Sequence, residues 1–354
     1  MSAGIKTKDK TSMPAFKIPT RMRAVMLHAY DELDRLVIEE QPVPQLRAGH
    51  VLVRMHASPI NPSDLAFLRG VYFRKKLPVI PGIEGSGVVV AAGRGLFAKA
   101  LVGRRVACIA PDEGAGGTWA EFIAVPALTC IPLKAATSME QGAMHFVNPL
   151  TAWLLIAEAQ RIHTRAIVQT AAAGALGKMI FRLAQQQNII SINLVRREEQ
   201  VATLRQLGAQ YVLNTATEDF EQRLHEICRE HDARLAFDAV GGEMTGKVLR
   251  AMPNGARLIS YGALSMQTLT LDPRLFISTG KKIEGFHLGR AVRSLNFTAR
   301  LQAVWQVRNM LTQELQSDIQ ARVPLEKVVS AIQLYSQNMS AGKVLLTMER
   351  NATQ

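Results

Sequence analysis

The segment VQTAAAGALGKM, residues 168–179, decides the fold class of this chain. It joins a strand-like apolar run to a stretch with helical periodicity, and small residues occupy the three key positions of a nucleotide-binding turn, Ala172, Gly174 and Gly177. In such a turn the backbone approaches a pyrophosphate, and the first amides of the helix hold the phosphates. An ordinary alanine-rich helix start is the alternative. The strand before the turn and the helix after it favour a nucleotide site.

The residues around this turn repeat the same alternation of apolar strands and amphipathic helices. Strands are predicted at 165–170, 190–195, 211–215, 234–240, 256–262 and 281–288, and helices at 175–187 and 198–207. This order predicts an α/β domain with a doubly wound parallel sheet. Residues 22–130 instead hold short β-rich runs broken by glycine and proline, which predict a barrel-like domain. Residues 323–348 are expected to form a helix and then a strand that could return to this first domain.

Length and composition limit the possible classes of protein. A chain of 354 residues favours two domains, and 48% hydrophobic with 20% charged residues is a globular composition. No uninterrupted apolar run approaches the roughly 20 residues of a membrane helix, so we expect no membrane partner. The three cysteines, Cys108, Cys130 and Cys228, include no CxxC pair. Their spacing predicts neither a disulfide framework nor a cysteine-rich zinc lobe and fits a reducing compartment.

The net charge of +13 favours association with phosphates, nucleic acid or other acidic surfaces, without choosing among them. Part of the excess lies in residues 1–23, which lack the apolar core of a signal peptide. This segment is rich in lysine and contains Asp9, which fits a transit peptide poorly. We therefore expect a flexible basic tail and a cytoplasmic protein.

The end of the second strand bears on the choice of nucleotide. NAD-preferring proteins place an acidic residue about 20 residues after the turn, whereas this chain has Arg196 and Arg197. Arginine can pair with a 2′-phosphate in forked geometry, which favours NADPH. The alternative is that both side chains are solvated and that Glu198 and Glu199 neutralise them.

A set of motifs in a fixed order resembles the medium-chain dehydrogenase/reductase superfamily. The motifs are INPSDLAFLRGVY (60–72), PGIEGSGVVVAAG (81–93), GGTWAEF (116–122), NPLTAW (148–153), AAAGALG (171–177), FDAVGG (237–242), ISYGA (259–263), GFHL (285–288) and GKVLL (342–346). Within that superfamily the chain resembles the zinc-free branch of quinone oxidoreductases and 2-enoyl thioester reductases. The resemblance implies a GroES-like β-barrel domain over 1–146 and 312–354, a Rossmann NADPH-binding domain over 147–311, and commonly a homodimer.

The resemblance also implies an activity without a metal. Zinc-dependent members carry a cysteine near the NPSD segment and a His-Glu pair where this chain has Ile83 and Glu84, so no metal ligands are predicted. Without zinc as a Lewis acid, hydride transfer to an already activated acceptor is the expected reaction. The candidate acceptors are an enoyl thioester, an enone or enal, and a quinone. An NADPH-binding protein that associates with nucleic acid and has little catalytic activity is the alternative.

Candidate site residues follow from the same motifs. Tyr72 matches the tyrosine of the enoyl thioester reductases and is the predicted proton donor, because a phenol remains protonated at neutral pH. Asn61 and Asp64 are predicted to line the catalytic pocket. All three could instead be ordinary loop residues. The predicted cofactor contacts are Asn148, Thr151, Ala172, Ala173, Gly174, Ala175, Leu176, Gly177, Arg196, Arg197, Asn214, Val240, Gly241, Tyr261, Gly262, Ala263, Phe286, Leu288 and Lys343. For Lys343, a phosphate contact and a solvated side chain are both open.

Overall fold

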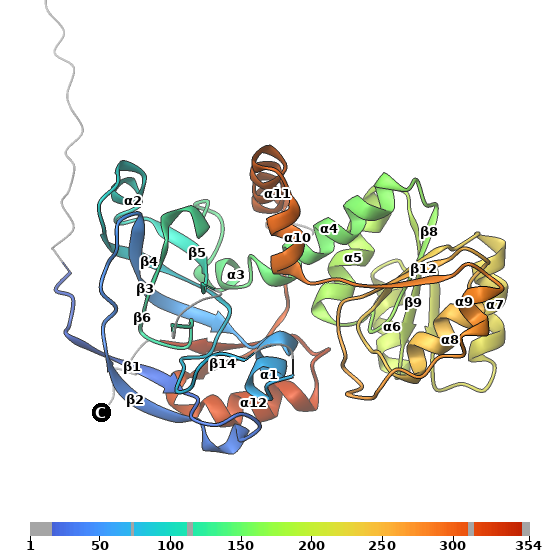
Figure 1. Ribbon diagram of the computed structural model, residues 1–354, viewed down its shortest axis with the longest axis horizontal. Coiled ribbons are helices and arrows are strands. Elements are labelled where there is room, and N and C mark those ends of the chain that lie inside the picture. The colour runs from blue at the N-terminus through green and yellow to red at the C-terminus, as the bar shows by residue number, and fades with distance from the viewer. Residues whose placement is uncertain (1–15, 72–73, 112–115, 311–314, 349–354) are drawn as a thin grey trace, which may run out of the picture.

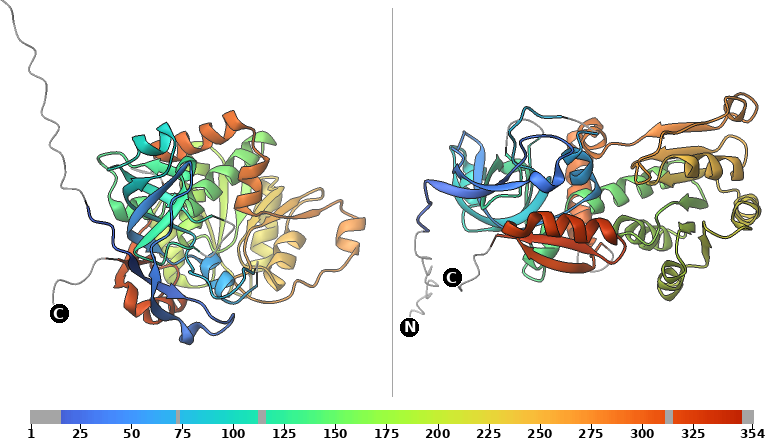
Figure 2. Two further views of the ribbon diagram at one scale, coloured as in Figure 1. Left: turned by 60° about the vertical axis from the view of Figure 1, so that its left-hand side comes forward. Right: turned by 90° about the horizontal axis from the view of Figure 1, so that it is seen from below.

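The chain forms two lobes that lie side by side (Figure 1). The computed structural model describes residues 16–71, 74–111, 116–310 and 315–348. We call β1–β7, α1–α3, β14, β15 and α12 the barrel lobe, and β8–β13 with α4–α11 the sheet lobe. The C-terminal elements lie with the N-terminal lobe in all views (Figures 1 and 2).

The barrel lobe is organised around the long strand β3 (His50–Pro59). Seven of its strands form one sheet in which β3 pairs antiparallel with β4, β6 and β15. The other strands of this lobe are β1 (Arg21–Met26), β2 (Val37–Pro42), β4 (Glu84–Ala92), β5 (Arg105–Ile109), β6 (Phe122–Pro126), β7 (Cys130–Pro132), β14 (Ile319–Pro324) and β15 (Lys343–Thr347). Its helices are α1 (Pro62–Leu68), α2 (Leu96–Ala100), α3 (Met139–Ala143) and α12 (Val328–Gln337), with short 3-10 turns η1 (Leu33–Arg35), η2 (Ala127–Thr129) and η3 (Leu325–Lys327). The predicted return of the C-terminal strand to this lobe is confirmed by its pairing with β3.

The sheet lobe contains a six-stranded parallel sheet in the order β10-β9-β8-β11-β12-β13. Its strands are β8 (Ala166–Gln169), β9 (Ile190–Val195), β10 (Tyr211–Asn214), β11 (Leu235–Asp238), β12 (Arg257–Ser260) and β13 (Lys282–Gly285). Its helices are α4 (Val147–Arg161), α5 (Ala175–Gln186), α6 (Glu198–Gln206), α7 (Phe220–Glu230), α8 (Glu243–Ala251), α9 (Arg274–Ile277), α10 (Leu288–Ser294) and α11 (Phe297–Met310). The strand order reverses between β8 and β11, which is where doubly wound sheets bind ligands.

Alternating residues of the central strands explain why helices cover both faces of this sheet. Ile167 and Phe237 pack in a buried cluster with α4 and α5, whereas Val168 and Ala236 pack in a second cluster with α7 and α8. Each large side chain buried in this way contributes about 1.5–3 kcal/mol. The predicted doubly wound sheet is therefore confirmed, and each of the six predicted strands contains one of the observed strands.

Helix α4 connects the two lobes. Its residues Leu150 and Leu155 share a buried cluster with Ala107 and Ile131 of the barrel lobe. Helices α10 and α11 pack on α4 and stand above the junction of the lobes in Figure 1. Because α4 contributes to a shared core, the exact domain limits remain predictions, and the limit at 311–312 lies outside the described residues. Among the described residues, no helix is both long and apolar enough to cross a bilayer.

Candidate functional site

The turn between β8 and α5 brings backbone groups close together. A Cβ atom on Gly177 would lie 2.4 Å from the carbonyl oxygen of Ala172, so only glycine fits there. Ala172 is fully buried and donates its amide to the Leu194 carbonyl of the next strand. Within the described part of the chain, nothing accepts a hydrogen bond from the amides of Ala175, Leu176 or Gly177 at the start of α5. These amides provide donors for an anion, as the sequence predicts.

A buried carboxylate ties the loops together on the other side of the strand-order reversal. Asp238 at the end of β11 accepts hydrogen bonds from Thr170 Oγ1 at 2.7 Å, Thr245 Oγ1 at 2.5 Å and the Val240 amide at 2.9 Å. The Gly262 backbone after β12 approaches Ala239 so closely that a Cβ atom would lie 2.8 Å from its carbonyl oxygen. The loops after β8, β11 and β12 therefore lie together at one edge of the parallel sheet.

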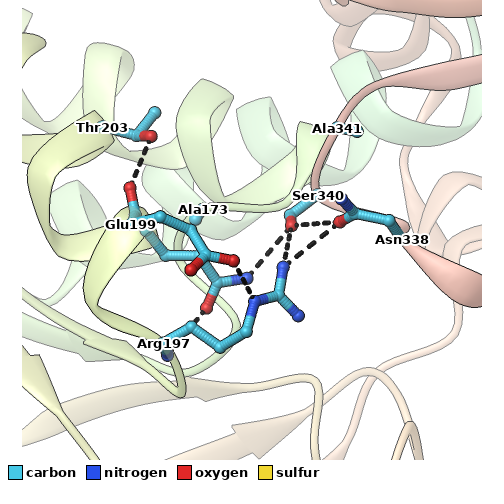
Figure 3. A pocket seen from close by; sticks show the side chains of 8 residues that line it. Ala173, Arg197, Glu199, Thr203, Asn338, Ser340 and Ala341 are labelled. Atoms are coloured by element: carbon cyan, nitrogen blue, oxygen red, sulfur yellow. Dashed lines mark hydrogen bonds and ion pairs between the residues drawn. The ribbon is translucent and has the colours of Figure 1, made fainter.

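The two arginines after β9 occupy different environments. Arg197 Nε donates to Glu199 Oε1 at 2.6 Å, and its Nη2 donates to Ser340 Oγ at 3.0 Å and Asn338 Oδ1 at 3.2 Å (Figure 3). Ser340 and Asn338 belong to the loop between α12 and β15, so this contact joins the two lobes. Arg196 is exposed, and its guanidinium has no polar partner in the ranges that the structure describes.

A small pocket of about 150 Å³ lies beside Arg197 and next to the turn (Figure 3). Its lining residues are Ala173, Arg197, Glu199, Gln200, Thr203, Asn338, Ser340 and Ala341. Gln200 Oε1 accepts hydrogen bonds from the amides of Arg196 and Arg197, and this fixes the backbone at the end of β9. Residues of both lobes therefore line the pocket, and most of their side chains are polar.

A buried polar network lies in the barrel lobe at its junction with α4. Asn61 Nδ2 donates to Glu84 Oε1 at 2.9 Å, and Lys343 Nζ donates to Asn61 Oδ1. Glu84 Oε2 accepts hydrogen bonds from the amides of Phe146 at 2.8 Å and Val147 at 3.1 Å. The carboxylate of Glu84 therefore occupies the N-terminus of α4, where the helix dipole favours a negative charge.

Burial shifts the protonation equilibria of this network. Burial raises the pKa of Asp64 to about 7, and the Glu84 charge adds to that rise while the Asn61 amide opposes it. Burial also raises the pKa of Glu84 and lowers that of Lys343 to about 8, each opposed by attraction between the two side chains. Asp64 Oδ1 has no hydrogen-bond partner within the described residues, whereas both oxygens of Glu84 have donors. A proton taken up by the two carboxyls therefore belongs mainly on Asp64.

Comparison with known proteins identifies the family. Residues 47–135 match the family model of the alcohol dehydrogenase GroES-like domain, and residues 175–306 match that of the zinc-binding dehydrogenases. A solved structure of a putative NADPH:quinone reductase from Mesorhizobium loti is 33% identical, covers 94% of this chain and 100% of its own, and superposes with a TM-score of 0.87. The chain belongs to the medium-chain dehydrogenase/reductase superfamily.

Other relatives of this superfamily member place it in the zinc-free branch and make it an oxidoreductase. The mitochondrial enoyl-[acyl-carrier-protein] reductase of Bos taurus is 27% identical over 95% of this chain and 91% of its own length. A putative NADPH:quinone reductase from Bacillus thuringiensis is 25% identical, covers 93% of this chain and 99% of its own, and has a TM-score of 0.84. No group of three or more histidine, cysteine, aspartate or glutamate residues in the described ranges could hold a metal ion.

The structure changes the interpretation of two predicted residues of this superfamily member. The Lys343 side chain is not solvated, because it is 1% exposed and its ammonium is bonded to Asn61, and its contact with a cofactor stays a prediction. Asn61 is fully buried, and its amide already donates to Glu84 and accepts from Lys343. Asn61 is therefore arranged to hold neighbouring residues in place, and Asp64 lies buried beside it. Tyr72, the predicted proton donor, lies outside the described residues.

The remaining predicted residues lie at or near the ends of the parallel strands and at the start of α4. Asn148 and Thr151 lie in the first two turns of α4 and are buried. Phe286 follows β13 and donates its amide to Ser260, and Leu288 begins α10. Asn214 ends β10 and donates to Glu198 Oε2 at 3.2 Å. Their contacts with a cofactor remain predictions.

Three residues escaped the sequence analysis as site-forming groups. Asp238 lies within the FDAVGG motif, and an acidic residue at the end of an apolar strand was the available signal. Glu84 was noted only because Ile83 and Glu84 stand where zinc-dependent members have a His-Glu pair. Ser340 carried no signal, because its contact with Arg197 spans 143 residues of sequence.

Proposed function

We propose that this protein is a zinc-independent, NADPH-dependent reductase that transfers hydride to an activated acceptor. The observation that carries the proposal is the glycine-dependent turn between β8 and α5, where the first amides of α5 and the Arg196 guanidinium have no partner among the described residues. Relatives named NADPH:quinone reductase and enoyl-[acyl-carrier-protein] reductase support the same class of reaction. They do not favour the alternative of a nucleic-acid-associated protein with little catalysis.

The geometry fits a dinucleotide with a 2′-phosphate. The amides of Ala175, Leu176 and Gly177 would hold the pyrophosphate, and Gly177 leaves room for the close approach of helix and strand. Arg196 and the polar pocket beside Arg197 would hold the 2′-phosphate. Asn148 and Thr151 would line the nicotinamide end. The bound nicotinamide would supply the hydride.

The protein itself would supply orientation and a proton. Tyr72 is the proposed donor to the substrate carbon or oxygen that becomes basic on reduction, because a phenol with a pKa near 10 keeps its proton at neutral pH. Asn61 and Asp64 are proposed to shape the substrate pocket through the buried network, without touching the substrate. The acceptor would be an enoyl thioester, an enone or enal, or a quinone.

Two features of the whole molecule are part of the proposal. Strand β13 pairs only with β12 among the described strands and forms an exposed edge, which could pair with a second copy in a homodimer. We also propose a cytoplasmic location, while noting that the bovine relative is named as mitochondrial. The GroES-like and Rossmann limits at 146–147 and 311–312 belong to the same proposal.

Cofactor binding can be tested before any acceptor is known. Titration of the purified protein with NADPH and with NADH, followed by the nicotinamide fluorescence, should give at least tenfold tighter binding of NADPH, because the 2′-phosphate adds charge-assisted hydrogen bonds of about 1.5–3 kcal/mol. Adenosine 2′,5′-bisphosphate should displace NADPH, and 5′-AMP should displace it far less well. Equal affinity for both dinucleotides would contradict the NADPH assignment.

A further inference from the structure

The network around Glu84 connects four separated elements of the chain. Lys343 begins β15, Asn61 precedes α1, Glu84 begins β4, and the two amides that Glu84 accepts belong to the start of α4. Three of these elements lie in the barrel lobe, and α4 is the first helix of the sheet lobe. The chain of hydrogen bonds thus crosses the junction between the lobes.

Glu84 is held at its backbone as well as at its side chain. Its carbonyl oxygen accepts hydrogen bonds from Ser58 Oγ at 2.7 Å and Thr118 Oγ1 at 3.0 Å, and all of these groups are buried. Its two carboxylate oxygens meet only donors, one from Asn61 and two from the backbone of α4. An ionised glutamate satisfies this arrangement, whereas a glutamine would present an amide group to at least one donor.

The start of α4 is also where the proposed site needs precision. Asn148 is the next residue after the two amides that donate hydrogen bonds to Glu84, and Thr151 follows three residues later. Both are buried in the first two turns of the helix. A displacement of about 1 Å at a site that orients reactants can lower a rate by about 100-fold. The orientation of α4 would therefore bear directly on hydride transfer.

Building on the proposed function, we propose that Glu84 is a positioning residue for the reduction. Through the chain Lys343–Asn61–Glu84 it fixes the N-terminus of α4 to the barrel lobe, and so holds Asn148 and Thr151 at the nicotinamide end of the site. The positive charge of Lys343 favours the ionised form of the buried carboxylate and so opposes the effect of burial. Glu84 does not touch the substrate or the cofactor in this role.

The first test is a Glu84→Gln variant with Glu158→Gln as its matched control. Glu158 lies at the other end of the same helix, where it pairs with Arg161 and Arg257. We expect Glu84→Gln to lower kcat by about 10–100-fold with the NADPH Kd changed less than about threefold, because the dinucleotide is held mainly by the sheet lobe. Glu158→Gln should keep the wild-type kcat. An unchanged kcat in a folded Glu84→Gln variant would overturn the proposal.

A second measurement covers the case in which Glu84→Gln does not fold. The titratable groups that face the network are Asp64, Glu84, Cys108, Tyr335 and Lys343. Burial raises the pKa of the Cys108 thiol and the Tyr335 phenol, so both stay neutral. Asp64 loses its proton at a lower pH, near 7, so a fall in wild-type kcat as pH rises through about 8 is expected from the loss of the Lys343 proton.

Replacing that lysine separates a positioning role from general stability. A Lys343→Met variant should have a kcat at least tenfold lower at pH 7 and should lack the fall near pH 8. The same fall in the variant would overturn the role of Lys343 in the chain. A wild-type protein that does not bind NADPH would instead contradict the proposed function, so the two failures are distinguishable.

Discussion

The carbonyl oxygen of Ala172 lies 2.4 Å from the point that a Cβ atom on Gly177 would occupy. This close approach packs the start of helix α5 against the turn that follows β8, and the first amides of α5 have no acceptor among the described residues. Replacing Gly177 with alanine forces a backbone shift, for which overpacking costs about 1–3 kcal/mol of unfolding free energy. We expect Gly177→Ala to lower both Tm and NADPH affinity. Gly116→Ala is the control, because a Cβ atom there has nothing within 4 Å. Wild-type NADPH affinity in Gly177→Ala would show that this turn does not hold the cofactor.

Arg196 and Arg197 should differ in their contribution to cofactor choice. The Arg196 guanidinium has no polar partner in the described part of the chain, whereas Arg197 already contacts Glu199 and Ser340. Arg196→Ala should therefore raise the KM for NADPH about tenfold and leave the KM for NADH unchanged. Steady-state kinetics with both dinucleotides measure this effect. Arg205→Ala, an exposed change on the following helix α6, should leave both values unchanged. Equal losses for NADPH and NADH in Arg196→Ala would argue against a 2′-phosphate contact.

A Tyr72→Phe variant tests the proposed proton donor. Loss of a general acid typically lowers a rate by about 10²–10⁴-fold, so kcat for an enone or enoyl thioester should fall by at least 10²-fold. The NADPH Kd and the Tm should stay at wild-type values. A lower Tm with little change in kcat would instead assign Tyr72 to the structure of its loop.

The stability of the protein should depend on the protonation of Asp64. Its pKa is raised by burial to about 7, so the folded state binds more protons than the unfolded state between about pH 4 and pH 7. The contribution of Asp64 to the free energy of unfolding is therefore fully present below pH 4 and is lost as pH rises through 7. Asparagine does not titrate and has no such loss. As pH rises from 5 to 8, the free energy of unfolding of Asp64→Asn should therefore increase by about 1–3 kcal/mol relative to that of the wild type. Urea unfolding at the two pH values measures this difference.

The exposed Asp219 provides the control for that comparison. Asp219→Asn should follow the wild-type pH dependence of the unfolding free energy. If Asp64→Asn also runs parallel to the wild type, the buried carboxyl of Asp64 does not take up the proton.

The elements of the sheet lobe could be predicted because their signals are local. A strand such as β9 is a continuous apolar run, and the turn before α5 is a short motif whose small residues have a steric reason. The two arginines that follow β9 are also a local signal, because they are adjacent in the sequence to the strand. The different roles of Arg196 and Arg197 were not predictable, because Arg197 meets a serine 143 residues away.

The buried network could not be predicted from the sequence for the same reason. Lys343 and Asn61 are 282 residues apart, and neither lies in a periodic pattern that predicts a contact between them. An isolated lysine at the start of a strand normally extends into solvent, whereas the pairing of β15 with β3 brings this one to Asn61. The motifs indicated Asn61, Asp64 and Lys343 as candidate site residues. Their mutual arrangement required the fold.

The most direct test of the proposed activity is NADPH consumption by the purified protein. Crotonyl-CoA, a simple enone and 1,4-naphthoquinone are offered separately, with NADH as the control cofactor. We expect turnover of at least one acceptor with NADPH and much slower turnover with NADH. Turnover of the thioester alone would identify an enoyl thioester reductase, and turnover of the quinone alone a quinone reductase. Tight NADPH binding without turnover of any acceptor would contradict the assignment of this protein as a reductase of activated double bonds or quinones.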